Sequence, residues 1–187
     1  RFNGGDQTIA YWGGVIITST PHFLEGEWLR YVELTLLHEL THAFEFLIEG
    51  NTNLGTDVWF REGIAVYIAG VDVFGISQID REEELDYWIA HCGDEWNQGN
   101  PICIHRWGDF PPDADYAYYY VVFELALRYI LSENGMGKSL NDILNIFYDM
   151  RTGIYFHHSF ENNIGISLAD FRDQFYTRVR EFLGSGN

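Results

Sequence analysis

The stretch that decides the fold is LLHELTHAFEFLIEG, residues 36–50. It places His38, Glu39 and His42 inside an otherwise apolar run. Residues four apart on a helix lie about 40° from each other around the axis, so His38 and His42 project together and can bind one metal ion. Glu39 lies about 100° around the helix axis from His38, where it can hold a water beside that metal. This is the geometry of the His-Glu-x-x-His motif, and the alternative is two buried histidines satisfied by core hydrogen bonds.

A catalytic zinc site needs a third protein ligand and an open fourth position. A His-x-x-Gly-x-x-His extension is excluded, because the chain has Glu45 and Ile48 where that pattern requires glycine and histidine. The other common answer is a glutamate from a second helix downstream, and VWFREGIAVYIAG supplies Glu62. A glutamate in a helix is ordinarily solvated, but one in so apolar a run needs a partner or a metal. Gly63 beside it would let this helix pack closely on the first.

The segments LLHELTHAF and VWFREGIAVYIAG resemble the gluzincin metallopeptidases, which combine a His-Glu-x-x-His helix with a glutamate ligand on a Glu-Gly-x-Ala-x-Tyr helix. Two later segments, YYYVVFELALRYILSENG and FENNIGISLADFRDQFYTRVREFL, are similar to helices of the aminopeptidase-like branch and of bacterial collagenase catalytic domains. The resemblance covers most of the chain. It implies a zincin-like metallopeptidase fold, with Zn²⁺ held by His38, His42 and Glu62 and with Glu39 as the general base.

Gluzincins often use a tyrosine hydroxyl to stabilise the developing oxyanion, and the resemblance places this role on Tyr120. The same turn carries three other candidates, which remain open: Tyr116, Tyr118 and Tyr119. The chain has 12 tyrosines, so packing is the ordinary role for most of them. His157 and His158 are a weaker alternative, because adjacent histidines in a segment such as YFHHSF are more often surface residues.

Two departures from the family pattern shape the expected activity. The aminopeptidase branch carries a Gly-x-Met-Glu-Asn motif whose glutamate holds the substrate's amine, whereas this chain has no acidic residue between Asp6 and Glu25. We therefore expect cleavage inside polypeptides, with extended substrate pairing along 15–18. The thermolysin-like branch has an aspartate four residues after the ligand glutamate, where this chain has Val66. The group that orients the histidines must come from elsewhere.

The composition limits the partners. The formal net charge is −17, from 11 basic and 28 acidic residues, so nucleic acid and anionic membrane surfaces would repel the chain. The acidity favours cationic substrates, Ca²⁺ or simply solubility, and solubility is the simplest reading. No apolar run is long enough to span a bilayer. We expect a monomer that acts on a polypeptide substrate.

The two cysteines, Cys92 and Cys103, flank a polar loop. A disulfide between them would stabilise the fold by roughly 3 kcal/mol, and we expect this bridge rather than free thiols. With that bridge we expect a secreted or extracytoplasmic protein. His91 and His105 lie beside the cysteines, so a second metal site is a minority alternative.

The rest of the chain is predicted to be mostly helical. TIAYWGGVIITST reads as one strand with a bulge at Gly13-Gly14, and residues 93–114 as a long loop. Helices are predicted over these ranges: 27–49, 58–70, 77–91, 115–135, 139–151 and 167–183, with Ser139 and Ser167 as N-caps. We therefore expect a mainly α fold with a small N-terminal β element, in the α+β class. One catalytic domain, 1–187, would comprise 1–75 with the edge strand and both zinc helices, 76–114 with a helix and loop, and a C-terminal helical subdomain, 115–187.

These observations together predict zinc-dependent hydrolysis of peptide bonds, in an endopeptidase whose Glu39 activates water. All four key residues of the motif are present, which favours an enzyme. Two alternatives remain. The first alternative is a non-catalytic zincin-fold binding module, and the second is a peptidase-like domain that serves only within a larger protein.

Overall fold

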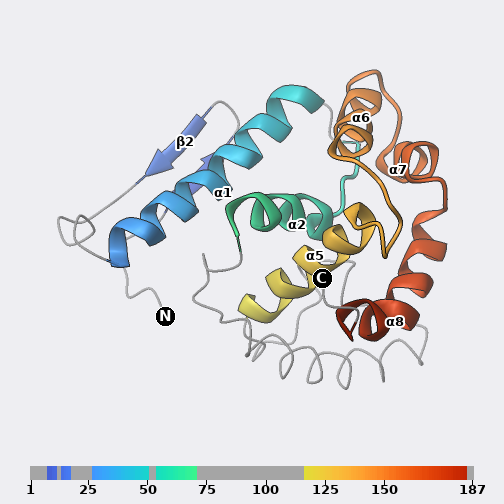
Figure 1. Ribbon diagram of the computed structural model, residues 1–187. Coiled ribbons are helices and arrows are strands. Elements are labelled where there is room, and N and C mark those ends of the chain that lie inside the picture. The colour runs from blue at the N-terminus through green and yellow to red at the C-terminus, as the bar shows by residue number, and fades with distance from the viewer. Residues whose placement is uncertain (1–7, 12–13, 18–26, 51–53, 71–115, 185–187) are drawn as a thin grey trace.

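The computed structural model describes residues 8–11, 14–17, 27–50, 54–70 and 116–184. Six helices form its body: α1 (Glu27–Glu49), α2 (Val58–Ala69), α5 (Tyr116–Leu131), α6 (Leu140–Arg151), α7 (Phe156–Ile164) and α8 (Leu168–Gly184). Helix α2 lies at the centre, between α1 and α5, and the three C-terminal helices flank this group (Figure 1). The predicted 77–91 helix and 93–114 loop lie outside the described residues.

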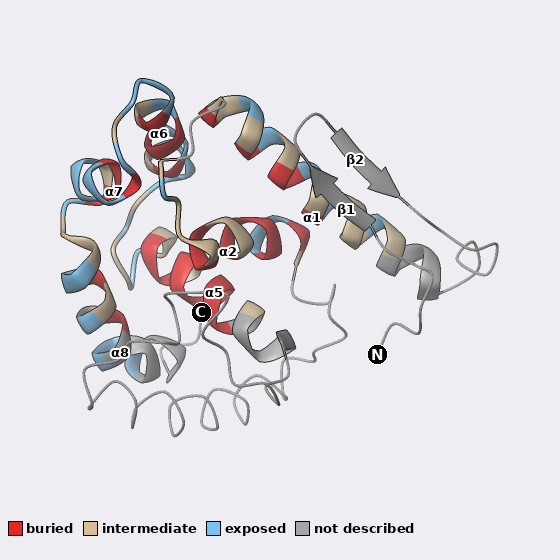
Figure 2. Ribbon diagram, turned by 180° about the vertical axis from the view of Figure 1, so that it is seen from behind, coloured by how far each residue is buried: buried red, intermediate tan, exposed pale blue. Residues whose placement is uncertain are grey.

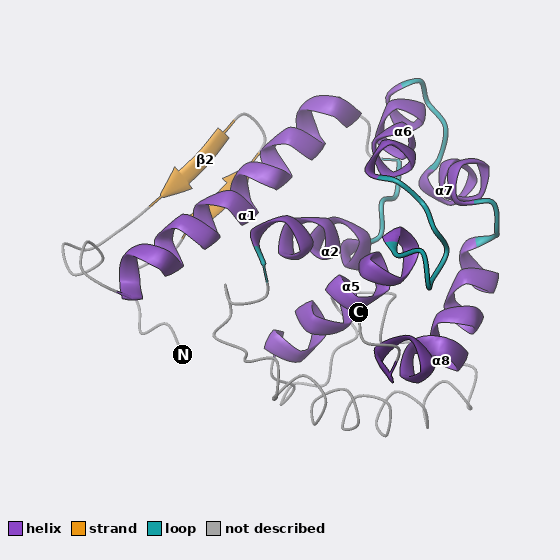
Figure 3. Cartoon of the chain, in the orientation of Figure 1, coloured by secondary structure: helices purple, strands orange, loops and turns teal. Residues whose placement is uncertain are grey.

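The expected α+β class is wrong, because the body of the described part of the chain is all-α and the hydrophobic core found there is built by helices. The predicted single strand is instead a hairpin of two four-residue strands, β1 (Thr8–Tyr11) and β2 (Gly14–Ile17), with Tyr11 paired to Gly14. A two-stranded ladder is too small to form a layer of a fold. The hairpin lies along α1, outside the helical core (Figure 3).

Local signals set several helix boundaries. Ser139 caps α6 by accepting from the backbone N–H of Asp142, while the Asp142 carboxylate accepts from the backbone N–H of Ser139, which forms a capping box. Ser167 likewise accepts from the N–H of Asp170 at the start of α8. Both predicted N-caps are confirmed. Helix α5 ends at Leu131, four residues before the predicted end at Gly135, and the chain turns over the intervening residues.

The core lies between α2, α5, α6, α7 and α8, as the buried residues in Figure 2 show. Aromatic rings fill its centre. The Trp59 and Phe171 rings stack with centroids 5.4 Å apart, and Phe60 contacts Phe156 at 5.1 Å. Burial of such rings supplies most of the stabilising free energy of a small domain. Among the described helices, none is long and apolar enough to cross a membrane.

Helix α1 reverses the usual distribution of side chains. Its buried residues are polar: His38, Thr41, His42, Glu45 and Glu49. Its exposed residues include four large apolar ones: Leu37, Leu40, Phe44 and Leu47. Phe44 is 63% exposed and Leu47 is 70% exposed, although spacings of three and four residues normally mark a core-facing stripe. The polar face of α1 is therefore the face that packs on α2.

Candidate metal centre

Helix α1 provides two histidines one turn apart on its buried face. His38 is 7% exposed and His42 is 8% exposed. Between them, the Thr41 hydroxyl donates a hydrogen bond of 2.8 Å to the carbonyl of Leu37, so this hydroxyl has its hydrogen-bond partner within the helix. The two imidazoles meet edge to face, with ring centroids 4.8 Å apart. The helical spacing alone produces this juxtaposition.

Helix α2 brings Glu62 to the same place. Gly63 lies against α5 and not, as the sequence predicted, against α1. An added Cβ atom there would lie 2.6 Å from the carbonyl oxygen of Phe123, so the close approach of α2 to α5 depends on this glycine. At the start of α2, the Asp57 carboxylate accepts from the indole of Trp59 at 3.1 Å and from Arg172 of α8 at 3.2 Å. These contacts fix the position of α2 and with it the direction of the Glu62 side chain.

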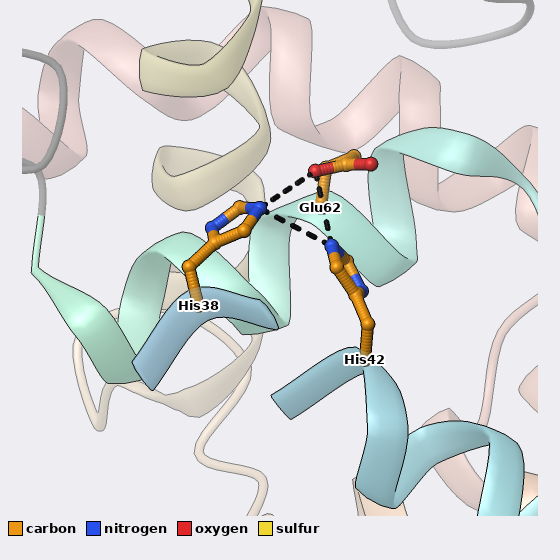
Figure 4. A group of neighbouring side chains, drawn as sticks. All are labelled: His38, His42 and Glu62. Atoms are coloured by element: carbon orange, nitrogen blue, oxygen red, sulfur yellow. Dashed lines mark hydrogen bonds and ion pairs between the residues drawn. The ribbon is translucent and has the colours of Figure 1, made fainter. Parts of the chain in front are cut away.

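Three donor atoms of these residues form a nearly equilateral triangle (Figure 4). Nε2 of His42 lies 3.2 Å from Nε2 of His38 and 3.3 Å from Oε2 of Glu62, and Nε2 of His38 lies 3.2 Å from the same oxygen. The structure thus brings together the three residues that the sequence predicts as metal ligands.

The triangle has the dimensions that a tetrahedral zinc ion requires. Bonds of about 2.0–2.1 Å from zinc to nitrogen and oxygen place any two ligand atoms about 3.3–3.4 Å apart. The three measured separations, 3.2, 3.2 and 3.3 Å, agree with that value. Two imidazoles and one carboxylate are also a common ligand set for catalytic zinc. The donor set therefore fits Zn²⁺.

A further carboxylate contacts the outer nitrogen of His42. Oε2 of Glu45 lies 3.1 Å from Nδ1 of His42, and Glu45 is only 3% exposed. Arg61 of α2 compensates this buried charge, with Nη1 3.7 Å from the same oxygen, and it also pairs with Glu49 one turn further along α1. Two ion pairs and the Glu62 contact thus join α1 to α2.

Charge and burial shift the titration of the cluster. Burial alone would lower the pKa of His42, but hydrogen bonds to Glu45 and Glu62, with their negative charges, outweigh it and raise this pKa to about 10. Burial raises the pKa of Glu62, yet hydrogen bonds from His38 and His42 dominate and lower it to about 2. Burial also raises the pKa of Glu45, against the opposing effects of His42 and Arg61.

Tyr120 is next to this triangle. Its ring centroid lies 6.1 Å from that of His38, in an edge-to-face contact. Burial raises the pKa of the Tyr120 hydroxyl, and the negative charges of Glu62 and Glu39 raise it further, so Tyr120 lies within electrostatic range of both carboxylates. The hydroxyl is therefore protonated at neutral pH and able to donate a hydrogen bond.

The other predicted candidates stand apart from this cluster or outside what the structure describes. His157 and His158 are exposed on α7 and do not belong to the three-residue group. Tyr116, Tyr118 and Tyr119 lie on α5, but their side chains are not among those described, so the choice of Tyr120 over them stays a prediction. The predicted Cys92–Cys103 bridge and the histidines beside it also lie outside the described residues.

Sequence reasoning missed Glu45, Arg61 and Glu49. A signal was present, because positions 38, 42, 45 and 49 fall at i, i+4, i+7 and i+11, within about 60° of one another around a helix. Four ionisable residues in such a stripe indicate a charged cluster under a neighbouring helix. The carboxylate that contacts the outer nitrogen of His42 is therefore on α1 itself, one turn after the histidine.

Comparisons with protein-family models, with curated proteins and with solved structures give no match.

Proposed function

We propose that this chain is a zinc-dependent metallopeptidase of the gluzincin type, and that it hydrolyses peptide bonds within polypeptides. One observation carries the proposal: Nε2 of His38, Nε2 of His42 and Oε2 of Glu62 lie 3.2–3.3 Å from one another. A ring nitrogen has one in-plane direction for a lone pair or a hydrogen, so His42 Nε2 cannot form a good hydrogen bond to both neighbours. A single cation bound by all three atoms satisfies them together.

Zinc, when bound by His38, His42 and Glu62, supplies a Lewis acid for the scissile carbonyl and lowers the pKa of water. Glu39 follows His38 directly in the chain, and its carboxylate takes a proton from the attacking water and passes it to the leaving amine. Tyr120 donates a hydrogen bond to the oxygen of the carbonyl as negative charge develops there. The raised pKa of its hydroxyl keeps that proton in place.

The substrate that we propose is an extended polypeptide, which the strongly acidic chain does not repel as it would a nucleic acid. Cleavage within the polypeptide is favoured because the stretch between Asp6 and Glu25 offers no carboxylate to hold a free amine. We also propose that the protein is a monomer. Its proposed location is secreted or extracytoplasmic, and this location depends on the Cys92–Cys103 bridge.

Elemental analysis after dialysis tests the metal site. We expect about one zinc per chain in the wild type and loss of most of it in His42→Ala. The control is His158→Ala, since His158 is exposed and outside the cluster, and it should keep its zinc. A His42→Ala protein that retained wild-type zinc would overturn the ligand assignment.

Hydrolysis of matched peptides tests the reaction. Glu39→Gln should keep zinc and lose hydrolysis, because the amide preserves the shape of the side chain and removes the base. Peptides with free and with acetylated amino ends should be cleaved equally. Cleavage of the free peptides alone, one residue at a time, would contradict endopeptidase activity.

A second candidate function is a non-catalytic module, alone or within a larger protein. The observation that favours it is the His42 pKa of about 10, since a proton on His42 satisfies both adjacent carboxylates without a metal. Such a protein would bind no zinc after dialysis, or would bind it without hydrolysing any peptide. The two experiments above separate these outcomes from the peptidase.

A further inference from the structure

The His42 ring is held at both of its nitrogens by different groups. Nδ1 lies 3.1 Å from Oε2 of Glu45, while Nε2 faces His38 at 3.2 Å and Glu62 at 3.3 Å. An ionised carboxylate only accepts hydrogen bonds, so a hydrogen bond to Glu45 requires the hydrogen on Nδ1. A neutral His42 then has its lone pair on Nε2, directed at the triangle of donor atoms.

Glu45 also forms an ion pair with an arginine of the neighbouring helix. Nη1 of Arg61 lies 3.7 Å from the same Oε2 atom, and Nη2 of Arg61 pairs with Glu49. The guanidinium carbon lies over two aromatic rings, 5.1 Å from the centroid of Phe46 and 5.7 Å from that of Phe147. A planar cation held on its face and at its edge has little freedom to move.

Arg61 directly precedes Glu62 on α2. Arg61 therefore contacts Glu45, the carboxylate next to Nδ1 of His42. The following residue, Glu62, contacts Nε2 of the same ring. A shift of α2 along α1 would disturb both contacts together. This arrangement couples the orientation of the His42 ring to the position of the second helix.

We propose that Glu45 is a positioning residue for the metal site, which fixes His42 with hydrogen on Nδ1 and Nε2 toward His38 and Glu62, and that Arg61 holds Glu45 in place. Its importance for metal binding rests on the proposed zinc function. The contact between Glu45 and His42 does not, because it joins two side chains directly. Histidine ligands in metalloproteins commonly donate their other N–H to a carboxylate, and loss of that partner lowers metal affinity by about 10- to 100-fold.

The first test observes the Nδ1 hydrogen of His42 by long-range proton–nitrogen NMR, in metal-free and zinc-loaded protein. We expect a slowly exchanging downfield signal in the wild type. Glu45→Gln should keep it, because the amide oxygen still accepts, and Glu45→Leu should lose it. If Glu45→Leu does not fold, the wild-type and Glu45→Gln spectra still test whether the Nδ1 hydrogen is protected from exchange. A rapidly exchanging Nδ1 hydrogen in either protein overturns the proposal.

The second test measures zinc affinity by competition with a chelator. Glu45→Leu should bind zinc about 10- to 100-fold more weakly, and Glu45→Gln should retain most of the affinity. The matched control is Glu124→Leu on α5, because Glu124 is equally buried, at 3% exposed, and pairs with an arginine, Arg128, rather than a histidine. We expect this control to bind zinc as the wild type does.

The outcomes distinguish this inference from the proposed function. Equal weakening in Glu45→Leu and Glu124→Leu would assign the effect to the loss of any buried carboxylate and overturn the positioning role. Weakening in Glu45→Leu without loss of the Nδ1 signal would do the same. A wild type that binds no zinc but shows the protected Nδ1 hydrogen would overturn the proposed function, while the Glu45–His42 contact would stand.

Discussion

At the residue scale, the cluster around His42 requires a positive charge. Glu45 and Glu62 approach the two nitrogens of one ring, and both carboxylates are largely buried. In the metal-free protein the proton on His42 supplies that charge, which is why its pKa rises to about 10. Zinc in the triangle would supply it instead, so proton and metal compete for the same nitrogen.

This competition gives the cluster a distinct dependence on pH. Because the pKa of His42 is raised to about 10, its Nε2 atom is protonated throughout the neutral range and must lose that proton to bind zinc. We expect the apparent zinc affinity to rise by about tenfold per pH unit between pH 7 and 9. Calorimetry in buffers of different ionisation enthalpy should detect about one proton released per zinc. Affinity that is constant over this range would show that His42 is neutral before binding.

At the element scale, Gly63 sets the distance between α2 and α5. A Cβ atom there would lie 2.6 Å from the backbone oxygen of Phe123, and a backbone atom cannot move aside as a flexible side chain would. We expect Gly63→Ala to lower the free energy of unfolding by about 2 kcal/mol, despite the better helix propensity of alanine. Denaturant titration of the metal-free protein measures this.

The same substitution should displace Glu62, which directly precedes Gly63 on α2, and weaken zinc binding. Ile68→Ala is the control, because Ile68 lies on the same helix with 43% of its surface exposed, and its loss should change stability by no more than about 0.5 kcal/mol. Wild-type stability in Gly63→Ala would mean that the two helices can separate without cost.

Helical spacing explains how far the sequence could predict these elements. The 27–49 helix was predicted with its bounds, and the pair at 38 and 42 follows from the turn of the helix. Helix α7 was missed because Tyr155 begins it without a side-chain cap, although Phe156, Phe160 and Ile164 follow a buried helical spacing. Contacts such as Arg61 with Glu45 join different helices, and no local pattern fixes which residues of α1 face α2.

At the scale of the whole molecule, the proposed site joins α1, whose buried face is polar, to α2, which belongs to the hydrophobic core. None of the buried members of the hydrophobic cluster comes from the described residues of α1, although Ile48 packs against it, whereas α2 contributes Trp59, Phe60 and Ile64. Charged and polar contacts therefore carry much of the attachment of α1 to the body. Binding at His38, His42 and Glu62 would link this helix to the core directly.

Zinc should accordingly stabilise the whole chain against heat. A ligand at 100 times its dissociation constant adds about 2.7 kcal/mol to the folded state, which corresponds to a rise in Tm of about 5–10 °C for a chain of this size. Calorimetry with and without zinc measures the shift. Glu62→Ala should show almost none, and an equal shift in this variant would place the stabilising ion elsewhere.

The reversed faces of α1 imply an unusual pattern of mutational tolerance. In most helices, replacing leucine or phenylalanine by a polar residue is damaging, and replacing a glutamate is harmless. In α1 this tolerance should be reversed, because Phe44 and Leu47 face solvent while Glu45 and Glu49 are buried. A saturation library of this helix should accept lysine or glutamine at 44 and 47 and reject leucine at 45 and 49. Selection on such a helix therefore conserves its buried charged residues and tolerates substitution at its most hydrophobic positions.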